Sequence, residues 1–321
     1  MFRTVLSPRS SPIKISHSDQ LLTLGSCFSE MIGRKLAENK FSVLSNPLGI
    51  LYNPVSQHRL LRYALGMEDI PELTVEVHGR FLHFDAHSRI NGISEEEVMQ
   101  SFSAEAEKVG NYLPKTSWLI LTYGTSMVYL KDDHIVANCH KQPGKTFTRR
   151  MLTLKEMLTD AEPVIERLIS DHPGLRIILT VSPVRHIRDT LEINSVSKSL
   201  LRLFCYEMAQ QFDRIDYFPS FEIMMDDLRD YRFYGKDMIH PNATAEDYIF
   251  DRFAETYFGE PTIALLQEWR KLRLALTHRP FNPESIDHRK FLESTRKGLL
   301  KLSDRLDLAS EIESIDKQLN E

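Results

Sequence analysis

The feature that most constrains the fold of this chain is a repeated alternation between short apolar runs and longer segments with helical periodicity. Short runs rich in branched and aromatic residues predict strands at 21–24, 118–123, 175–181 and 215–218. Apolar residues at helical spacing predict helices at 28–40, 154–169, 194–212 and 244–258, the last with Thr244 as its N-cap. Strands that alternate with helices require βαβ crossovers, so the sequence predicts an α/β protein with a mainly parallel sheet covered on both faces.

Two segments interrupt this alternation. Residues 73–84 alternate around His78-Gly79, and residues 128–136 turn at Asp132-Asp133. Both patterns are typical of β-hairpins, so we expect two hairpin insertions in the α/β unit.

The strand pattern stops after Pro261, and the chain is therefore divided into a domain of residues 1–260 and a C-terminal helical extension of residues 261–321. Charged amphipathic helices are predicted at 263–276 and 289–319. Leu265, Trp269, Leu272 and Leu276 form an apolar stripe that needs a partner, because an amphipathic helix alone in water is marginal. The partner is either the body of the protein or a second copy of the extension in a homodimer. Phe281 is expected to be buried where the extension bends back.

The composition limits the classes of partner. The 321 residues are 42% hydrophobic with a formal net charge of -5, which is an ordinary balance for a globular protein and gives no overall attraction for nucleic acid. Three cysteines in a chain of this length favour a reducing compartment. Neither a signal peptide nor a membrane-spanning run is recognisable, so we expect a cytoplasmic protein that does not contact membranes.

Polar clusters follow the predicted strands. They are Gly25-Ser26-Cys27, Gly124-Thr125-Ser126, Ser182-Pro183 with Arg185-His186, and Asp237-Met238-Ile239-His240. Ligands bind outside the carboxyl ends of the strands in an open parallel sheet, so these clusters predict a single site. His186 is interpreted as a solvated loop histidine, with a pocket position as the alternative.

The first and last clusters contain groups for nucleophilic catalysis. A thiol at a helix N-terminus has a lowered pKa, and the unpaired N–H groups there bind an oxyanion. Asp237 and His240 have the spacing of a carboxylate that orients an imidazole base. The alternatives are a buried, inert Cys27 and a helix-capping segment with a surface His240.

The sequence predicts no metal or cofactor. Cys139 and His140 are adjacent and have no companion at a ligand spacing, which argues against a metal site. Neither GxGxxG nor GxxxxGK[ST] occurs, which argues against dinucleotide and P-loop cofactors.

The motifs, taken in order, resemble the GSCFA family. They are Leu24-Gly25-Ser26-Cys27-Phe28-Ser29, residues 46–54, Tyr123-Gly124-Thr125-Ser126, residues 138–141, residues 181–185, Asp237–Pro241 and residues 278–281. That family resembles the SGNH/GDSL hydrolases, which are three-layer α/β/α proteins that cleave or transfer acyl esters. The resemblance implies an esterase, a deacetylase or an acyltransferase acting on a small-molecule or glycan acyl ester. The alternative is a non-catalytic ligand-binding protein with the same fold.

The resemblance also implies roles for individual residues. Aligning Gly25 with the first glycine of the superfamily motif places Cys27 on the nucleophile, with Ser26 as the second candidate. The N–H groups of Cys27 and Gly49 would bind the oxyanion. In Gly124-Thr125-Ser126, the Ser126 hydroxyl replaces the usual asparagine amide, which Asn138 would supply instead. His140 would contact substrate, and Asp237 and His240 complete the triad.

Overall fold

Five parallel strands form the central sheet in the order β11-β10-β6-β1-β2. The computed structural model describes residues 3–320. The strands are β1 (Gln20–Gly25), β2 (Ser42–Ser45), β6 (Thr116–Tyr123), β10 (Arg176–Val181) and β11 (Ile215–Phe218). Leu24 lies opposite Leu121, which in turn lies opposite Leu179. The predicted α/β class and mainly parallel sheet are therefore confirmed.

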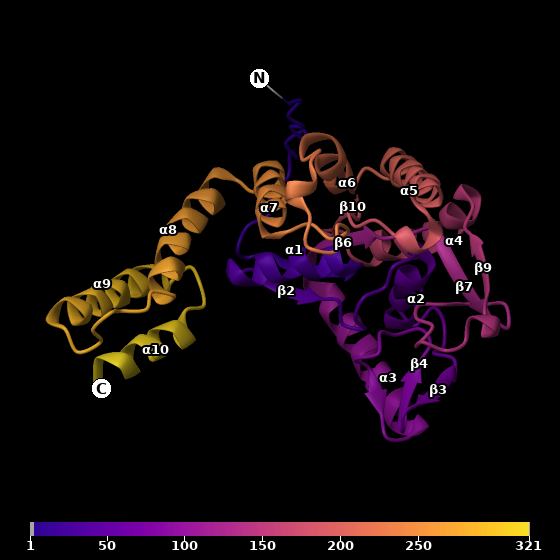
Figure 1. Cartoon of the computed structure of the whole chain (residues 1–321), viewed down its shortest axis with the longest axis horizontal. Helices are drawn as coiled ribbons and strands as arrows, with labels where there is room; N and C mark the ends of the chain where they lie inside the picture. Colours follow the sequence, from indigo (N-terminus) through magenta and orange to yellow (C-terminus); the bar gives the residue numbers. More distant parts are fainter. Residues whose placement is uncertain (1–2, 321) are drawn as a thin grey trace.

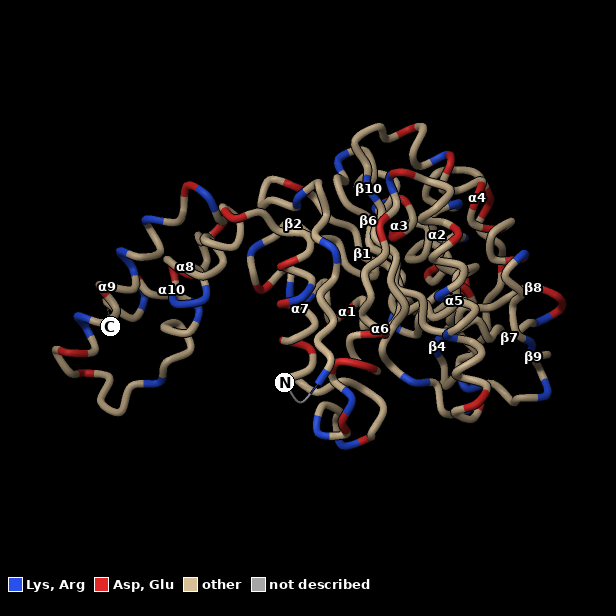
Figure 2. The backbone as a smooth tube through the Cα atoms, turned by 90° about the horizontal axis from the view of Figure 1, so that it is seen from above, with Lys and Arg blue, Asp and Glu red and all other residues tan. Residues whose placement is uncertain are grey.

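Helices cover both faces of this sheet. Alternate strand residues point to opposite faces: Leu119 and Leu121 enter one hydrophobic cluster, while Trp118 and Ile120 enter another. The first cluster is covered by α2 (Pro54–Ala64), α3 (Glu95–Tyr112), α4 (Leu154–Asp171) and α5 (Leu191–Gln211). The second is covered by α1 (Cys27–Glu38) and α7 (Ala243–Tyr257). Figure 2 shows α1 and α7 on one side of the strands and α2, α4 and α5 on the other.

The four helices predicted in the body occur within a few residues of their expected bounds, and one of them has a different N-cap. The N-cap of α7 is Asn242 and not Thr244, because the Asn242 side chain accepts the N–H of Ala245 at 3.1 Å. The sequence analysis did not predict α2 or α3. Short helical segments complete the body: α6 (Ser220–Glu222), η1 (Leu113–Lys115), η2 (Gly144–Thr146), η3 (Ile187–Asp189), η4 (Ile223–Asp227) and η5 (Tyr231–Phe233).

Both hairpin insertions are confirmed, and each has a third strand that was not predicted. The strands β3 (Thr74–Val77), β4 (Arg80–His83) and β5 (Asn91–Gly92) form one antiparallel sheet, and β7 (Met127–Lys131), β8 (His134–Val136) and β9 (Thr148–Met151) form the other. The two turn residues of each hairpin have positive φ, at His78-Gly79 and at Asp132-Asp133. Such turns match the twist of the flanking strands.

The C-terminal extension consists of α8 (Glu260–Leu276), α9 (Ile286–Leu302) and α10 (Ala309–Asn320). Figure 1 shows these helices as a group beside the body, and in the space-filling view they form a lobe of their own. Leu265 and Trp269 are buried in a separate hydrophobic cluster with α9 and α10, and Leu272 and Leu276 pack against it. The predicted apolar stripe is confirmed, but the expectation about its partner is wrong: the cluster that buries it is formed by α9 and α10, the helices that follow α8, and not by the body or a second copy.

Two expectations about the extension are wrong. Phe281 is fully exposed, because the segment between α8 and α9 runs over the surface and does not fold back onto the body. Residues 289–319 are not one helix: the chain leaves helical conformation between α9 and α10 and then turns back, which lets both helices share the cluster with α8.

No helix within residues 3–320 is long and apolar enough to cross a membrane.

Candidate active site

The topological switch of the sheet lies between β1 and β6. From β1 the chain continues to one neighbour, β2, and the later strands are added on the other side of β1. Crevices form at such points outside the carboxyl ends of the strands. Gly25 ends β1, and it pairs with Thr122 near the end of β6. The first two predicted polar clusters therefore meet at the switch point.

The turn from β1 into α1 requires a glycine and fixes the next residue as a cap. Gly25 has φ +143°, and a Cβ on it would lie 2.2 Å from the carbonyl oxygen of Thr122. Ser26 is the N-cap of α1; it is 1% exposed, and its Oγ accepts the N–H of Phe28 at 3.3 Å. The Ser26 hydroxyl is therefore occupied within the protein, which favours Cys27 as the reactive group.

Cys27 is the first residue of α1 and is partly exposed. Its N–H precedes the hydrogen bonds of the helix and is one of the unpaired donors of a helix start. Burial raises the pKa of its thiol and outweighs Lys198 and the first N–H groups of the helix, which lower it. The expectation of a lowered thiol pKa is therefore wrong, because desolvation is the larger effect.

Asp237 and His240 form a preorganised pair in the segment between β11 and α7. His240 Nδ1 lies 2.6 Å from Asp237 Oδ2, and Asp237 Oδ1 accepts the N–H groups of Ile239 and His240, both at 3.0 Å. These backbone N–H groups, followed by His240, lower the pKa of Asp237 to about 2. The ionised carboxylate thus orients the imidazole and leaves Nε2 free.

Arg185 ties this turn to the loop after β10. Its guanidinium donates to the carbonyl oxygen of Met238, whose φ is +60°. The same guanidinium lies 4.5 Å from the ring centroid of Tyr234 and 5.4 Å from that of Tyr231. The turn that carries His240 is therefore held by a contact from a different strand end.

Two basic side chains that were not predicted as site residues, His186 and Lys198, lie near the carboxyl edge of the sheet. His186 Nε2 is buried without a hydrogen-bond partner among residues 3–320, and its ring packs against Tyr52 with 5.4 Å between the ring centroids. Burial, followed by the charges of Lys198 and His240, lowers the pKa of His186 to about 4. The interpretation of His186 as a solvated histidine is wrong. Lys198 on α5 is 1% exposed, and burial lowers its pKa to about 7.

Most of the expected oxyanion donors are paired within the protein. The Gly49 N–H donates to Asn46 O at 2.7 Å. The N–H groups of Gly124 and Thr125 donate to Tyr52 O at 2.7 and 3.2 Å. The Ser126 hydroxyl is buried and donates to Ser197 Oγ at 3.0 Å. Of the expected donors, this leaves the Cys27 N–H.

The segment at 138–140 bears on two further expected roles. Asn138 Oδ1 accepts the N–H of His140 at 2.8 Å, which closes a local turn. That bond does not engage the Asn138 amide nitrogen, so the role of Asn138 as an amide donor stays a prediction. His140 is 3% exposed, and its ring nitrogens pair with Ser88 Oγ and with the carbonyl oxygen of His83. The expected role of His140 as a substrate contact is not supported by this geometry.

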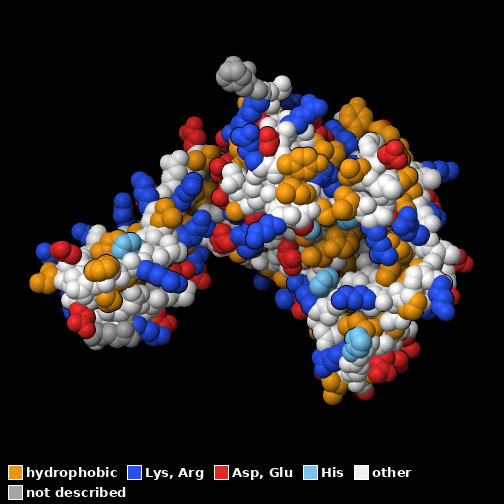
Figure 3. Space-filling view, viewed as in Figure 1, with side chains coloured by type: hydrophobic (Ala, Val, Ile, Leu, Met, Phe, Trp, Pro, Cys, Tyr) orange, Lys and Arg blue, Asp and Glu red, His pale blue; other side chains and the backbone are white. Residues whose placement is uncertain are grey.

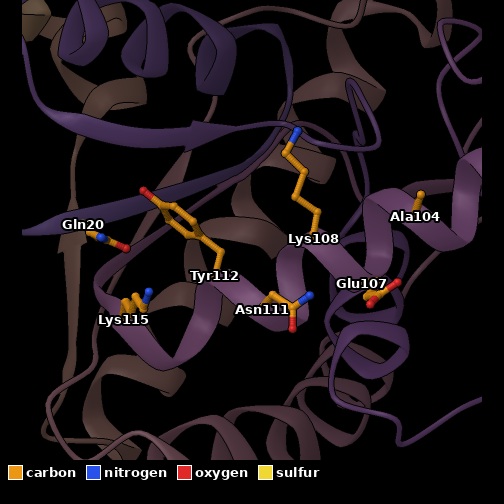
Figure 4. A pocket seen from close by; sticks show the side chains of 7 residues that line it. All are labelled: Gln20, Ala104, Glu107, Lys108, Asn111, Tyr112 and Lys115. Atoms are coloured by element: carbon orange, nitrogen blue, oxygen red, sulfur yellow. The ribbon is translucent and has the colours of Figure 1, made fainter.

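Within residues 3–320, Cys27 and His240 lie at the same edge of the sheet but do not hydrogen-bond to each other, and no three His, Cys, Asp or Glu side chains gather as metal ligands. A surface pocket of about 530 Å³ (Figure 4) lies at the opposite, amino end of β1. Gln20, Lys108 and Tyr112 are among its lining residues. That pocket is therefore not part of the candidate site.

Fold and site define an α/β protein with a parallel sheet, with a cysteine after β1 at the switch point and a histidine–carboxylate pair in the segment between β11 and α7. The chain belongs to the GSCFA family: residues 20–253 match that family, and residues 269–321 match the C-terminal domain of GSCFA domain proteins. No curated protein matches the chain.

Two solved structures are similar to the chain at low identity. One is a proposed platelet activating factor from Streptococcus pneumonia, with 14% identity, a TM-score of 0.41, and coverage of 74% of this chain and 83% of that one. The other is a carbohydrate esterase family 2 enzyme with a carbohydrate-binding domain from Corynascus thermopiles (Myceliophthora fergusii), with 13% identity, a TM-score of 0.40, and coverage of 80% and 69%.

Proposed function

We propose that this protein is an esterase, a deacetylase or an acyltransferase, with Cys27 as nucleophile, His240 as base and Asp237 as the residue that orients the base. The observation that carries the proposal is the Asp237–His240 pair, held at 2.6 Å at the edge of the sheet where α1 presents Cys27. A carboxylate that fixes an imidazole at the mouth of a nucleophile turn is the arrangement of acyl-transfer sites.

The reaction follows from these groups. His240 Nε2 takes the thiol proton as Cys27 Sγ attacks the carbonyl carbon of the ester, which gives a tetrahedral oxyanion. The oxyanion collapses to a thioester on Cys27, and the leaving alkoxide takes the proton from His240 to depart as an alcohol. Water, or an acceptor alcohol in a transferase, then attacks the thioester while His240 takes its proton. The proton returns to Cys27, and the acid or the new ester is released.

The Cys27 N–H is the donor for the oxyanion in this scheme. The usual asparagine is absent, and losing one such donor costs about 2.7–4 kcal/mol in a related mechanism. His240 is half-exposed, with 51% of its side chain accessible, so its ring can be reached by a substrate. Hydrogen bonds of apo sites are often long and tighten when substrate binds.

The second candidate is a non-catalytic ligand-binding protein. The observation that favours it is the internal pairing of the expected donors: the N–H groups of Gly49, Gly124 and Thr125 and the Ser126 hydroxyl all bond within the protein. A site without free donors binds a carbonyl compound without accelerating its cleavage.

Turnover of short-chain acyl esters and acetylated glycans tests the proposal, with Cys27→Ala and Ser26→Ala compared side by side. We expect Cys27→Ala to reduce kcat by roughly 10⁴-fold or more. Ser26→Ala should keep most of the activity and lose about 1 kcal/mol of stability as its cap is removed. Turnover that survives Cys27→Ala contradicts the assigned nucleophile, and binding without turnover on any ester favours the second candidate.

Addition of acceptor alcohols to the same assay separates the two reactions. A rate that rises with acceptor concentration indicates a transferase, and an unchanged rate indicates a hydrolase. A small-molecule or glycan acyl ester as substrate, a cytoplasmic location and a homodimer through the C-terminal helices remain predictions.

A further inference from the structure

Two buried side-chain amides, those of Asn46 and Gln57, hold the turn between β1 and α1. Asn46 directly follows β2 and Gln57 lies on α2, and both side chains are fully buried. Asn46 Oδ1 accepts the N–H of Gly25 at 2.8 Å. Gln57 Nε2 donates to the carbonyl oxygens of Leu51 and Thr122, both at 3.0 Å. Asn46 therefore contacts the turn itself, and Gln57 joins the two segments on either side of it.

The other backbone groups at the start of the turn pair with the two residues that Gln57 joins. Gly25 O accepts the N–H of Leu51 at 2.9 Å, and the Ser26 N–H donates to Thr122 O at 3.2 Å. Both of these partners are held in place by Gln57 Nε2 through their carbonyl oxygens. The peptide unit that follows Ser26 therefore has little freedom to rotate.

Each of the two amides leaves one polar atom without a partner. An N–H group bonds only to an acceptor and a carbonyl oxygen only to a donor, so the contacts fix which way each amide points. Asn46 Nδ2 and Gln57 Oε1 then have no hydrogen-bond partner among residues 3–320. A buried polar atom without a partner is unfavourable for folding. The two amides are therefore better explained by the geometry that they give the turn than by stability.

We propose that Asn46 and Gln57 are positioning residues that direct the Cys27 N–H toward the oxyanion formed in acyl transfer. As the first residue of α1, Cys27 has an N–H that precedes the hydrogen bonds of the helix, and the peptide unit after Ser26 sets its direction. A misplacement of about 1 Å in a reacting geometry costs roughly 10²-fold in rate. The inference rests on the proposed function, because the oxyanion forms only when an ester acylates Cys27.

Two reactions of the Cys27 thiol separate this role from a structural one. Acylation by p-nitrophenyl acetate passes through a tetrahedral oxyanion, and release of p-nitrophenolate follows it, with the protein in excess and the release from Cys27→Ala subtracted. Alkylation by iodoacetamide displaces iodide without forming an oxyanion, and peptide mass spectrometry follows it at Cys27. A change in the pKa or the exposure of the thiol alters both rates, so the ratio of acylation to alkylation reports on the oxyanion donor.

Three variants make the comparison. Asn46→Gly removes one amide and suits the φ of +43° at that position. Gln57→Met removes the other amide and keeps an unbranched side chain of similar length. The matched control is Asn39→Ala at the opposite end of α1, where the Asn39 amide donates to Lys35 O at 2.8 Å. The control removes a comparable amide hydrogen bond from the same helix, at the end away from Cys27.

We expect Asn46→Gly and Gln57→Met each to lower the ratio of acylation to alkylation by roughly 10-fold or more, and Asn39→Ala to leave it unchanged. An unchanged ratio in either folded variant overturns the role of that residue, including the case in which both rates fall together. The two variants are independent, so one that does not fold leaves the other as the test.

The same data separate this inference from the proposed function. Acylation of the wild type with an equal ratio in all variants contradicts only the inference. A wild-type Cys27 that iodoacetamide alkylates and that the ester does not acylate contradicts the proposed function, and the inference with it.

Discussion

The carboxyl edge of the sheet and the C-terminal helices bury different types of residue. At the edge, polar side chains are buried without full pairing: among residues 3–320, Lys198 bonds only to carbonyl oxygens and His186 Nε2 has no hydrogen-bond partner. In the C-terminal helices the buried residues are almost all apolar, and charges such as Arg296 and Asp316 pair on the surface. The carboxyl edge therefore buries polar groups at a cost in stability, and the C-terminal helices bury apolar surface that adds stability.

The contact between the two parts of the molecule is polar as well as apolar. Trp269 Nε1 donates to the carbonyl oxygen of Glu38, the last residue of α1, at 2.8 Å, and Lys40 pairs with Glu311 at 2.5 Å. A carbonyl at a helix C-terminus needs such a donor. The C-terminal helices therefore hold the end of α1, the helix whose other end carries Cys27. Changes at the edge should therefore alter activity with little effect on stability, and changes in the C-terminal helices should do the opposite.

The largest expected effect is at Asp237. Asp237→Asn keeps an oxygen for the N–H groups of Ile239 and His240 but faces His240 Nδ1 with an amide N–H, which favours the wrong imidazole tautomer. We expect kcat on a cleaved ester to fall by about 10⁴-fold. Urea unfolding should show a much smaller change than the activity assay, since the side chain is half-exposed. Unchanged kcat would remove Asp237 from the mechanism.

The next effect is in the C-terminal helices. Trp269→Ala removes the largest side chain of their cluster and the N–H that pairs with Glu38, so we expect a loss of about 3–5 kcal/mol in urea unfolding. Leu274→Ala on the same helix, at a position 64% exposed, is the control and should change stability by less than about 0.5 kcal/mol. Activity of the folded Trp269→Ala protein should match the wild type. A large loss of activity at full folding would mean that the C-terminal helices shape the site.

The smallest effect is at His186, which lies at the edge of the sheet and whose Nε2 is buried. Its pKa is about 4 in the folded protein and near 6.5 when exposed, so the unfolded chain binds more protons between those values. Folded stability therefore falls as the pH drops from 6.5 toward 4, by as much as about 1.4 kcal/mol per pH unit from this group.

His186→Asn should lose that part of the pH dependence. Urea unfolding at several pH values between 4 and 7 compares the two slopes. Equal slopes in wild type and variant would show that His186 is solvated after all.

Four strands of the central sheet and both hairpins could be predicted because their signals are local, whereas β2 (Ser42–Ser45) was not predicted. Runs such as 175–181 and the turn at Asp132-Asp133 contain their own periodicity and turn residues, and the structure places β10 and the β7–β8 turn there. The third strands of the hairpin sheets could not be predicted, since β9 pairs with β7 across an intervening strand and loop and has no alternating pattern of its own. The predicted burial of Phe281 was wrong because it depended on the path of the surface segment between α8 and α9.

The candidate site also contains some features that have a local sequence signal and others that do not. The positions of Cys27 and Asp237–His240 at one edge follow from their places after strands, which the sequence contains. Lys198 had a signal that was not used: it lies on the apolar stripe of its helix with Leu201 and Cys205, where a lysine is unusual. His186 had none, because its enclosure depends on Tyr52, which is remote in sequence.

The α/β class and the candidate nucleophile, base and orienting carboxylate follow from the sequence, because periodicity and turn chemistry act over a few residues. The packing of distant segments is what raises the pKa of Cys27 by burial, pairs the N–H groups of Gly124 and Thr125 with Tyr52 O, and buries Lys198 against carbonyl oxygens. Desolvation and hydrogen-bond pairing depend on which distant segments close around a group, and that information is absent from any short stretch of the chain.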